Sequence, residues 1–193
     1  MNLKEINLEI QECRKCPLEK TRNHVIVGEG PQNAPIMIIG EAPGRDEDLQ
    51  GRPFVGKSGQ LLDKILEACG FNRKEHVYIS NILKCRPPGN RTPQPEEIAA
   101  CQPWLMKQVE LIDPKIIILL GATALKTLVG KDQRITLVRG QWLVWSGRPT
   151  MPVFHPSALL RNPGLKRPTW EDYKKIVHKY RELVNSSHYS AHV

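Results

Sequence analysis

Apolar residues in this chain form two patterns, short continuous runs and longer stretches with helical spacing. The runs that indicate strands are residues 36–39, 77–82 and 115–120. The last is a continuous Ile/Leu run bounded by Pro114 and Gly121, which is typical of a strand buried on both faces of a sheet. Two more β-prone pieces, 142–145 and 151–154, predict a further strand before the last helix.

Between these runs, apolar residues recur every three to four positions, which predicts amphipathic helices. The expected helices cover residues 58–69, 96–111, 122–129 and 170–184, and a short amphipathic segment covers residues 3–12. Strands that alternate with helices imply a parallel sheet with right-handed crossovers. We therefore expect a single α/β domain over residues 1–193, in which residues 185–193 form a flexible tail.

Charge adds a hint about partners. The formal net charge of +8 favours a polyanionic partner, although a merely basic cellular protein has the same balance. No apolar run approaches the ~20 residues of a transmembrane helix, and the first residues lack the apolar core of a signal peptide. We therefore expect a cytoplasmic protein with no membrane partner.

The loop after the first strand is the first candidate site. In open α/β folds, ligands bind just beyond the carboxyl ends of the strands. Here the strand ends in Gly-Glu-Ala-Pro-Gly at 40–44, and the loop continues with further carboxylates at Asp46, Glu47 and Asp48. Asp46 and Asp48 are equally well explained as solvated carboxylates or helix N-caps, so we give them no chemical role.

The five cysteines suggest a metal centre, because disulfides are not expected in a reducing compartment. Cys13 and Cys16 form a CxxC pair, and Cys85 and Cys101 complete a set of four. Spacing alone leaves three readings open, which are zinc, an iron–sulfur cluster and free buried cysteines. Cys69 lies on the apolar face of a predicted helix and is expected to be a core residue.

Three further motifs follow in order along the chain. Phe54 lies in a Gly/Pro loop, Asn81 ends the second strand, and the sequence HPSALLR follows the last strand at 155–161. Together with the 40–44 loop and the cysteine set, this ordered combination resembles the family 4 uracil-DNA glycosylases, the iron–sulfur branch of that superfamily. The resemblance runs from about Cys13 to the C-terminal helix.

The resemblance implies a three-layer fold with a central, mainly parallel four-stranded sheet flanked by helices. It also implies a monomer that acts on uracil-containing DNA, and it identifies no partner protein. The metal question is then decided for a [4Fe–4S] cluster, which organises two segments near DNA and takes no redox step. Its expected ligands are Cys13, Cys16, Cys85 and Cys101.

The implied reaction is hydrolysis of the uracil N-glycosidic bond, which leaves an abasic site. Phe54 would stack on the flipped base, and His155 would donate to uracil O2 as negative charge develops there. The Asn81 amide offers a donor and an acceptor that match O4 and N3–H of uracil but mismatch cytosine.

The resemblance also assigns the residues around the uracil. Glu41 is the candidate that orients water or stabilises the oxocarbenium ion, whereas the better-known branch has an Asp one residue further along, where this chain has Ala42. Gly40 and Ala42 belong to the uracil pocket. Glu47 lies near the C5 edge of uracil, where it would crowd the methyl group of thymine.

Residues 156–161 resemble the family's minor-groove loop. In that loop Leu159 or Leu160 would wedge into the gap left by the flipped base, with Ser157 and Arg161 also on the DNA. Basic residues outnumber acidic ones from position 155 to 181, and others flank the second cysteine pair, which predicts a phosphate track and salt-sensitive binding. Beside the second cysteine pair, the track would use Lys84, Arg86 and Arg91.

Two alternatives stay open. One is a superfamily member that becomes covalently trapped on DNA, but residues 84–94 lack the histidine of that branch's basic insertion. The other is a non-catalytic, metal-stabilised module that binds nucleic acid.

Overall fold

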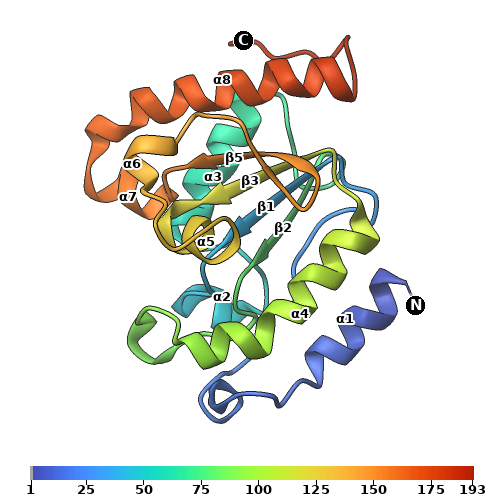
Figure 1. Ribbon diagram of the computed structural model, residues 1–193, viewed down its shortest axis with the longest axis vertical. Helices are drawn as coiled ribbons and strands as arrows, with labels where there is room; N and C mark the ends of the chain where they lie inside the picture. Colours follow the sequence, from blue (N-terminus) through green and yellow to red (C-terminus); the bar gives the residue numbers. More distant parts are fainter. Residues whose placement is uncertain (1) are drawn as a thin grey trace.

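The computed structural model describes residues 2–193 and places a five-stranded sheet between two layers of helices (Figure 1). The strands are β1 (Ile36–Gly40), β2 (Val77–Asn81), β3 (Ile116–Leu120), β4 (Leu143–Trp145) and β5 (Arg148–Val153). Their order is β2-β1-β3-β5-β4, and every neighbouring pair is parallel except β4 with β5. The sheet thus exceeds the expected four strands, because a tight turn at Ser146 (φ 49°) and Gly147 (φ 71°) makes a hairpin of β4 and β5.

Helices cover both faces of the sheet. They are α1 (Leu3–Gln11), α2 (Arg45–Gln50), α3 (Lys57–Ala68), α4 (Pro95–Ile112), α5 (Gly121–Leu128), α6 (Ile135–Val138), α7 (Pro156–Arg161) and α8 (Lys166–Leu183). The turns Pro17–Lys20, Pro88–Asn90 and Pro163–Leu165 are 3₁₀ helices. Within residues 2–193, no helix has the length and apolar character needed to cross a membrane.

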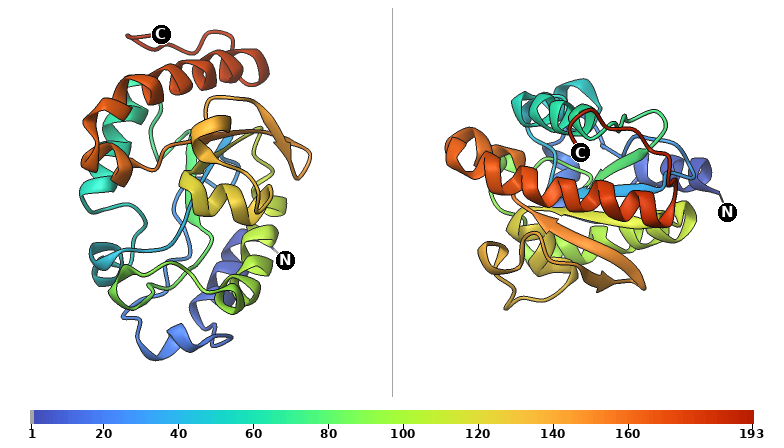
Figure 2. Two further views of the ribbon diagram at one scale, coloured as in Figure 1. Left: turned by 60° about the vertical axis from the view of Figure 1, so that its left-hand side comes forward. Right: turned by 90° about the horizontal axis from the view of Figure 1, so that it is seen from above.

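Two apolar clusters, one on each face, form the core. Helices α1, α4 and α5 contribute to one cluster, and α3 and α8 contribute to the other (Figures 1 and 2). In β1, Met37 and Ile39 belong to the first cluster, while Ile36 and Ile38 belong to the second, because successive side chains of a strand point to opposite faces. Every residue of β1, β2 and β3 is buried, which accounts for their continuous apolar sequences.

Two segments that the sequence predicted as loops are short helices. Helix α2 begins after Gly44, whose backbone N–H donates to the Glu47 carboxylate at 3.1 Å. Helix α7 begins after His155, whose ring accepts a hydrogen bond from the Ser157 N–H at 3.1 Å. Each helix is therefore started by a side-chain contact at its own N-terminus, which hydrophobic spacing does not reveal.

The C-terminal segment is packed, which corrects the prediction of a flexible tail. His188 is buried, its Nε2 donates to the Cys69 carbonyl at 2.8 Å, and its ring stacks on Phe71 at a centroid distance of 4.7 Å. Arg181 donates to the carbonyl oxygens of His188 (3.0 Å) and Val193 (2.9 Å). The tail therefore extends the packing around the end of α3.

Asp48 ties α2 to the irregular segment that precedes β1. Its side chain is 1% exposed and accepts hydrogen bonds from the Asn23 N–H (2.9 Å), the Asn23 amide (2.6 Å) and the His24 N–H (3.2 Å). Of the two carboxylates left without a role, Asp48 is thus a structural anchor.

We expect Asp48→Ala to lower the free energy of unfolding by about 2–4 kcal/mol, because buried donors of Asn23 and His24 would lose a charged acceptor. Chemical denaturation of the purified variant measures this loss. Asp46→Ala is the matched control, since Asp46 is an exposed carboxylate of the same helix and its loss is expected to cost less than about 1 kcal/mol. Equal losses in both variants would contradict the anchoring role.

Candidate active site

A pocket of about 400 Å³ opens where β1, β2 and β5 end. It brings together many of the side chains that the sequence selected, namely Glu41, Ala42, Glu47, Phe54, Asn81, His155, Ser157 and Arg161. The pocket is also lined by Ser58, Pro87 and Asn90, which sequence reasoning missed. The Pro/Gly/Arg composition around Asn90 predicted a loop but carried no signal that the loop faces the pocket.

Gly40 is not among the residues that line the pocket, but it lies against two that are, Asn81 and Phe54. Gly40 and Asn81 are register partners at the ends of β1 and β2, and the Asn81 side chain is buried. A Cβ atom on residue 40 would lie 2.5 Å from Asn81 Oδ1 and 2.8 Å from Phe54 Cζ, so only glycine leaves room for both side chains. Within residues 2–193, Asn81 Oδ1 has no hydrogen-bond partner. A buried acceptor without a partner costs ~1–3 kcal/mol, so this oxygen favours a ligand that donates.

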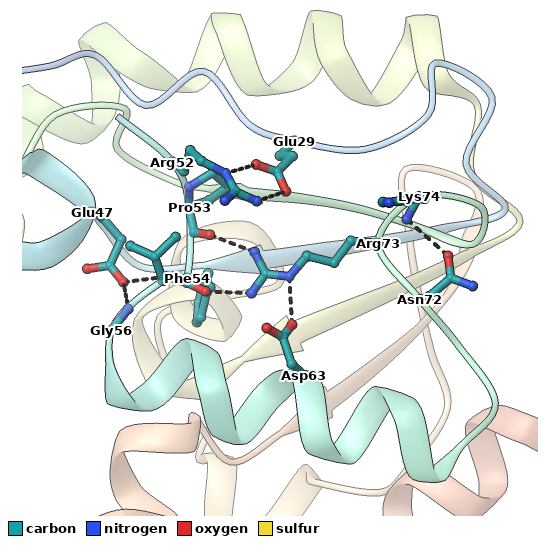
Figure 3. A network of polar contacts seen from close by, with 11 residues as sticks. Glu29, Glu47, Arg52, Pro53, Phe54, Gly56, Asp63, Asn72, Arg73 and Lys74 are labelled. Atoms are coloured by element: carbon teal, nitrogen blue, oxygen red, sulfur yellow. Dashed lines mark hydrogen bonds and ion pairs between the residues drawn. The ribbon is translucent and has the colours of Figure 1, made fainter. Parts of the chain in front are cut away.

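Phe54 is held in an unusual backbone conformation by a network of polar contacts (Figure 3). Its φ angle is 51°, and its ring centroid lies 5.7 Å from that of His155. Arg73 donates to the carbonyl oxygens of Pro53 (2.8 Å) and Phe54 (2.5 Å) and pairs with Asp63 at 2.6 Å. These contacts offset the strain of a positive φ at an aromatic residue.

The two glutamates of the pocket differ in their partners. Glu47 Oε1 accepts hydrogen bonds from the N–H groups of Val55 (2.9 Å) and Gly56 (3.0 Å), the second of which is seen in Figure 3. Glu47 Oε2 accepts from the Gly44 N–H at 3.1 Å. The Glu47 carboxylate therefore holds the loop that carries Phe54. In contrast, the Glu41 carboxylate makes no hydrogen bond or ion pair with any other part of residues 2–193 and remains available for a water molecule or a substrate.

The tautomer of His155 follows from its hydrogen bonds. The Ser157 N–H donates to His155 Nδ1 at 3.1 Å, and the Ser157 hydroxyl lies 2.8 Å from the same nitrogen. Since a backbone N–H can only donate, Nδ1 is the acceptor and the proton of the neutral ring is on Nε2. Burial, reinforced by the charge of Arg161 and opposed by Glu47, lowers the pKa of His155 to about 4. The ring is therefore a neutral Nε2–H donor at neutral pH.

The two leucines of α7 that were candidates for a DNA wedge differ in their exposure to solvent. Leu159 is only 1% exposed, so it is a core residue and the prediction that it contacts DNA is wrong. Leu160 is 44% exposed, and Arg161 lies at the pocket. Ser157 has a further part beyond the predicted contact with DNA, because both its N–H and its hydroxyl contact His155.

The four cysteines that the sequence selected as metal ligands all line one small pocket, which is separate from the candidate active site. Cys13, Cys85 and Cys101 each receive an N–H···S hydrogen bond of 3.3 Å, from Trp104 Nε1, Arg22 Nη1 and the Lys84 N–H respectively. The residues around the pocket that bear sulfur are Cys13, Cys16, Cys85 and Cys101. Donors of this kind stabilise thiolate sulfur, so the pocket suits metal-bound cysteines.

Burial changes the pKa values of the cysteine thiols. It raises the pKa of Cys16 and Cys85 and raises the pKa of Cys101 to about 11, so these thiols are protonated unless a metal binds them. Within residues 2–193, no group of three or more His, Cys, Asp or Glu side chains has an arrangement that could hold a single metal ion. Cys69 is fully buried in the cluster formed with α3 and α8, as the sequence predicted.

The predicted phosphate track loses one member. Lys84 is 1% exposed, so it cannot contact DNA. Arg91 lines the pocket but forms a bidentate pair with Glu97, at 3.0 and 2.6 Å. A charge pattern in sequence cannot distinguish a buried lysine from an exposed one, because both have the same polar neighbours in the chain.

Known proteins resemble this chain over most of its length. Residues 27–176 match the family model described as the uracil DNA glycosylase superfamily. A type-4 uracil-DNA glycosylase of Thermotoga maritima is 49% identical over 88% of this chain and 90% of its own length, and one of Archaeoglobus fulgidus is 42% identical over 91% and 92%. A type-5 uracil-DNA glycosylase of Pyrobaculum aerophilum is 31% identical over 70% of this chain and 66% of its own. The chain therefore belongs to the uracil DNA glycosylase superfamily and, within it, to the type-4 family.

Proposed function

We propose that this chain is a monofunctional uracil-DNA glycosylase, which flips uracil out of DNA and hydrolyses its N-glycosidic bond. The observation that carries the proposal is the buried Asn81 Oδ1, an acceptor without a protein partner at the floor of a pocket beside an aromatic ring. The whole chain acts as one domain and as a monomer. Free uracil and an abasic site are the products, as in the first step of base excision repair.

Asn81 and Phe54 recognise the base. Asn81 Oδ1 accepts from uracil N3–H, and the amide nitrogen donates to O4. Cytosine presents an acceptor and a donor in the reverse places, so it leaves two buried groups unpaired at ~1–3 kcal/mol each. Phe54 stacks on the flipped ring, and Gly40 and Ala42 leave the space that the ring needs. Glu47, through the loop it holds and its own position, narrows the pocket at the C5 edge of the base.

Glu41 and His155 serve the bond-breaking step. The departing uracil gains negative charge at O2, and the neutral Nε2–H of His155 donates to that oxygen. The sugar gains oxocarbenium character, which the unpaired Glu41 carboxylate stabilises while it orients the attacking water. Glu41 suits this role better than Glu47, whose oxygens are already occupied by backbone N–H groups.

We further propose that the second pocket holds a [4Fe–4S] cluster on Cys13, Cys16, Cys85 and Cys101. Four cysteines line this one pocket, which matches the Cys₄ ligand set that would hold such a cluster. Zinc is the alternative for a set of four cysteines, and metal analysis distinguishes the two. When bound, the cluster supplies a rigid link between the N-terminal segment and the segment that follows β2.

The position of α7 beside the pocket supports a contact between this helix and DNA. Exposed Leu160 enters the gap left by the flipped nucleotide, and Arg161 contacts a phosphate. Lys166 and Arg167, at the start of α8, extend the phosphate contacts, so binding weakens steeply as salt increases.

The function is tested with a labelled oligonucleotide that contains one uracil. After incubation with the protein, hot alkali should cleave the strand only at the uracil position. Binding without cleavage would instead support a non-catalytic module, and a band that resists denaturation would support a covalently trapped relative.

We expect Asn81→Ala to lower kcat/KM by about 10–1,000-fold, because two hydrogen bonds to the base are lost. Its affinity for the same oligonucleotide with thymine should equal that of the wild type, and an equal loss there would point to misfolding.

The lowered pKa of His155 predicts how kcat/KM of the enzyme changes at low pH. Protonation of Nδ1 would break the hydrogen bond from the Ser157 N–H and displace the ring, so activity requires the neutral form. Since the pKa of His155 is lowered to about 4, kcat/KM should stay level as the pH falls through 6.5 and decline only as it approaches about 4. Steady-state rates between pH 4.5 and 8 measure this. The assignment would be contradicted if kcat/KM of the wild type fell to half its maximum near pH 6.5 and this pH dependence were absent in His155→Ala.

Substitution of the cysteines tests the cluster. Cys101→Ser should lower iron content from about four atoms per chain and abolish broad visible absorbance. Cys69→Ala is the matched control and should keep both, because Cys69 lies in the apolar core. Iron analysis and visible spectroscopy measure the outcome. Colourless wild-type protein that is loaded with zinc and active would refute the cluster.

A further inference from the structure

Lys84 is a charged side chain that none of the roles above uses. It is 1% exposed, and its ammonium group donates to the Ser80 hydroxyl, to the Asn81 carbonyl oxygen at 3.1 Å and to Gln108 Oε1 at 2.7 Å. All three acceptors are neutral. Within residues 2–193, no Asp or Glu lies within ion-pair distance of Lys84.

A buried ammonium without a counter-charge is costly, even when neutral groups accept its hydrogen bonds. Lys84 lines the cysteine pocket, and its backbone N–H donates to Cys101 Sγ at 3.3 Å. No Asp or Glu is among the described residues that line this pocket. The groups of the pocket that can carry negative charge are therefore its four cysteines, as thiolates bound to a metal.

We propose that Lys84 is the buried counter-charge of the metal-bound cysteines and that it positions Asn81 relative to them. This inference rests on the proposed function, since it links the cluster to the residue that reads uracil. The link is short. The Lys84 backbone contacts Cys101, and the Lys84 ammonium holds the Asn81 carbonyl, so one residue joins both sites.

The arrangement explains why a lysine occupies this core position. Four thiolates outweigh the positive charge of the cluster core, so a nearby cation stabilises the bound state. Arg22, which also lines the pocket, supplies one such cation through its contact with Cys85 Sγ. Lys84 supplies a second from inside the protein, where low polarity strengthens the attraction.

The test uses the iron-loaded full-length protein and three variants. Lys84→Met keeps an unbranched apolar side chain, one atom shorter than lysine, and removes the charge. Ser80→Ala removes one acceptor and keeps the charge. Lys107→Met is the matched control, because Lys107 is an exposed cation above the ring of Trp104, which itself contacts Cys13.

Lys84→Met should shift the midpoint reduction potential of the cluster to a more negative value, because a reduced cluster carries more negative charge. It should also weaken binding of free uracil several-fold, since Asn81 loses its anchor. Ser80→Ala and Lys107→Met should keep the wild-type potential. A purely structural lysine would leave the potential of Lys84→Met unchanged, and that result would overturn the proposal. Failure of uracil release would leave the shift in reduction potential unaffected, so the two proposals fail separately.

Discussion

Parallel pairing of β1 with β2 sets Gly40 beside Asn81, and the rest of the pocket depends on this register. A slip of one residue would turn each side chain of the strand to the opposite face. The register is fixed because both strands are buried on both faces, so each of their side chains has a defined place in one of the two core clusters. The missing Cβ at residue 40 then admits the Phe54 ring and the Asn81 amide together.

Near this pair of residues, carboxylates that lie close together in the sequence have different hydrogen-bond partners and therefore different roles. Asp48 anchors the segment before β1, and Glu47 holds the Phe54 loop through backbone N–H groups. Glu41 alone among these three has no such contact within residues 2–193, and for that reason we propose it for the chemistry. Partners, and not residue type, distinguish a structural carboxylate from a reactive one.

The core strands and long helices were predictable from sequence because continuous or periodic apolar runs encode burial directly. Many of the pocket residues were predictable because ordered motifs contain them, but Ser58, Pro87 and Asn90 lie outside those motifs and were missed. The short helices were not predictable, since α2 and α7 depend on caps from Glu47 and His155, which also face the site. Neither the burial of Lys84 nor the choice between Leu159 and Leu160 was predictable, because each depends on how distant segments pack.

The Phe54 loop has a consequence for how the empty pocket can be observed. Its order depends on two amide hydrogens, those of Val55 and Gly56, that point at Glu47, and on the Arg73 guanidinium that grips two carbonyl oxygens. These contacts lie in a connecting segment, where local opening is less costly than global unfolding. Slow exchange of the two amides with deuterated solvent would thus report that the pocket is assembled before any base enters it. Their exchange rate gives a direct reading of preorganisation, independent of turnover and of DNA.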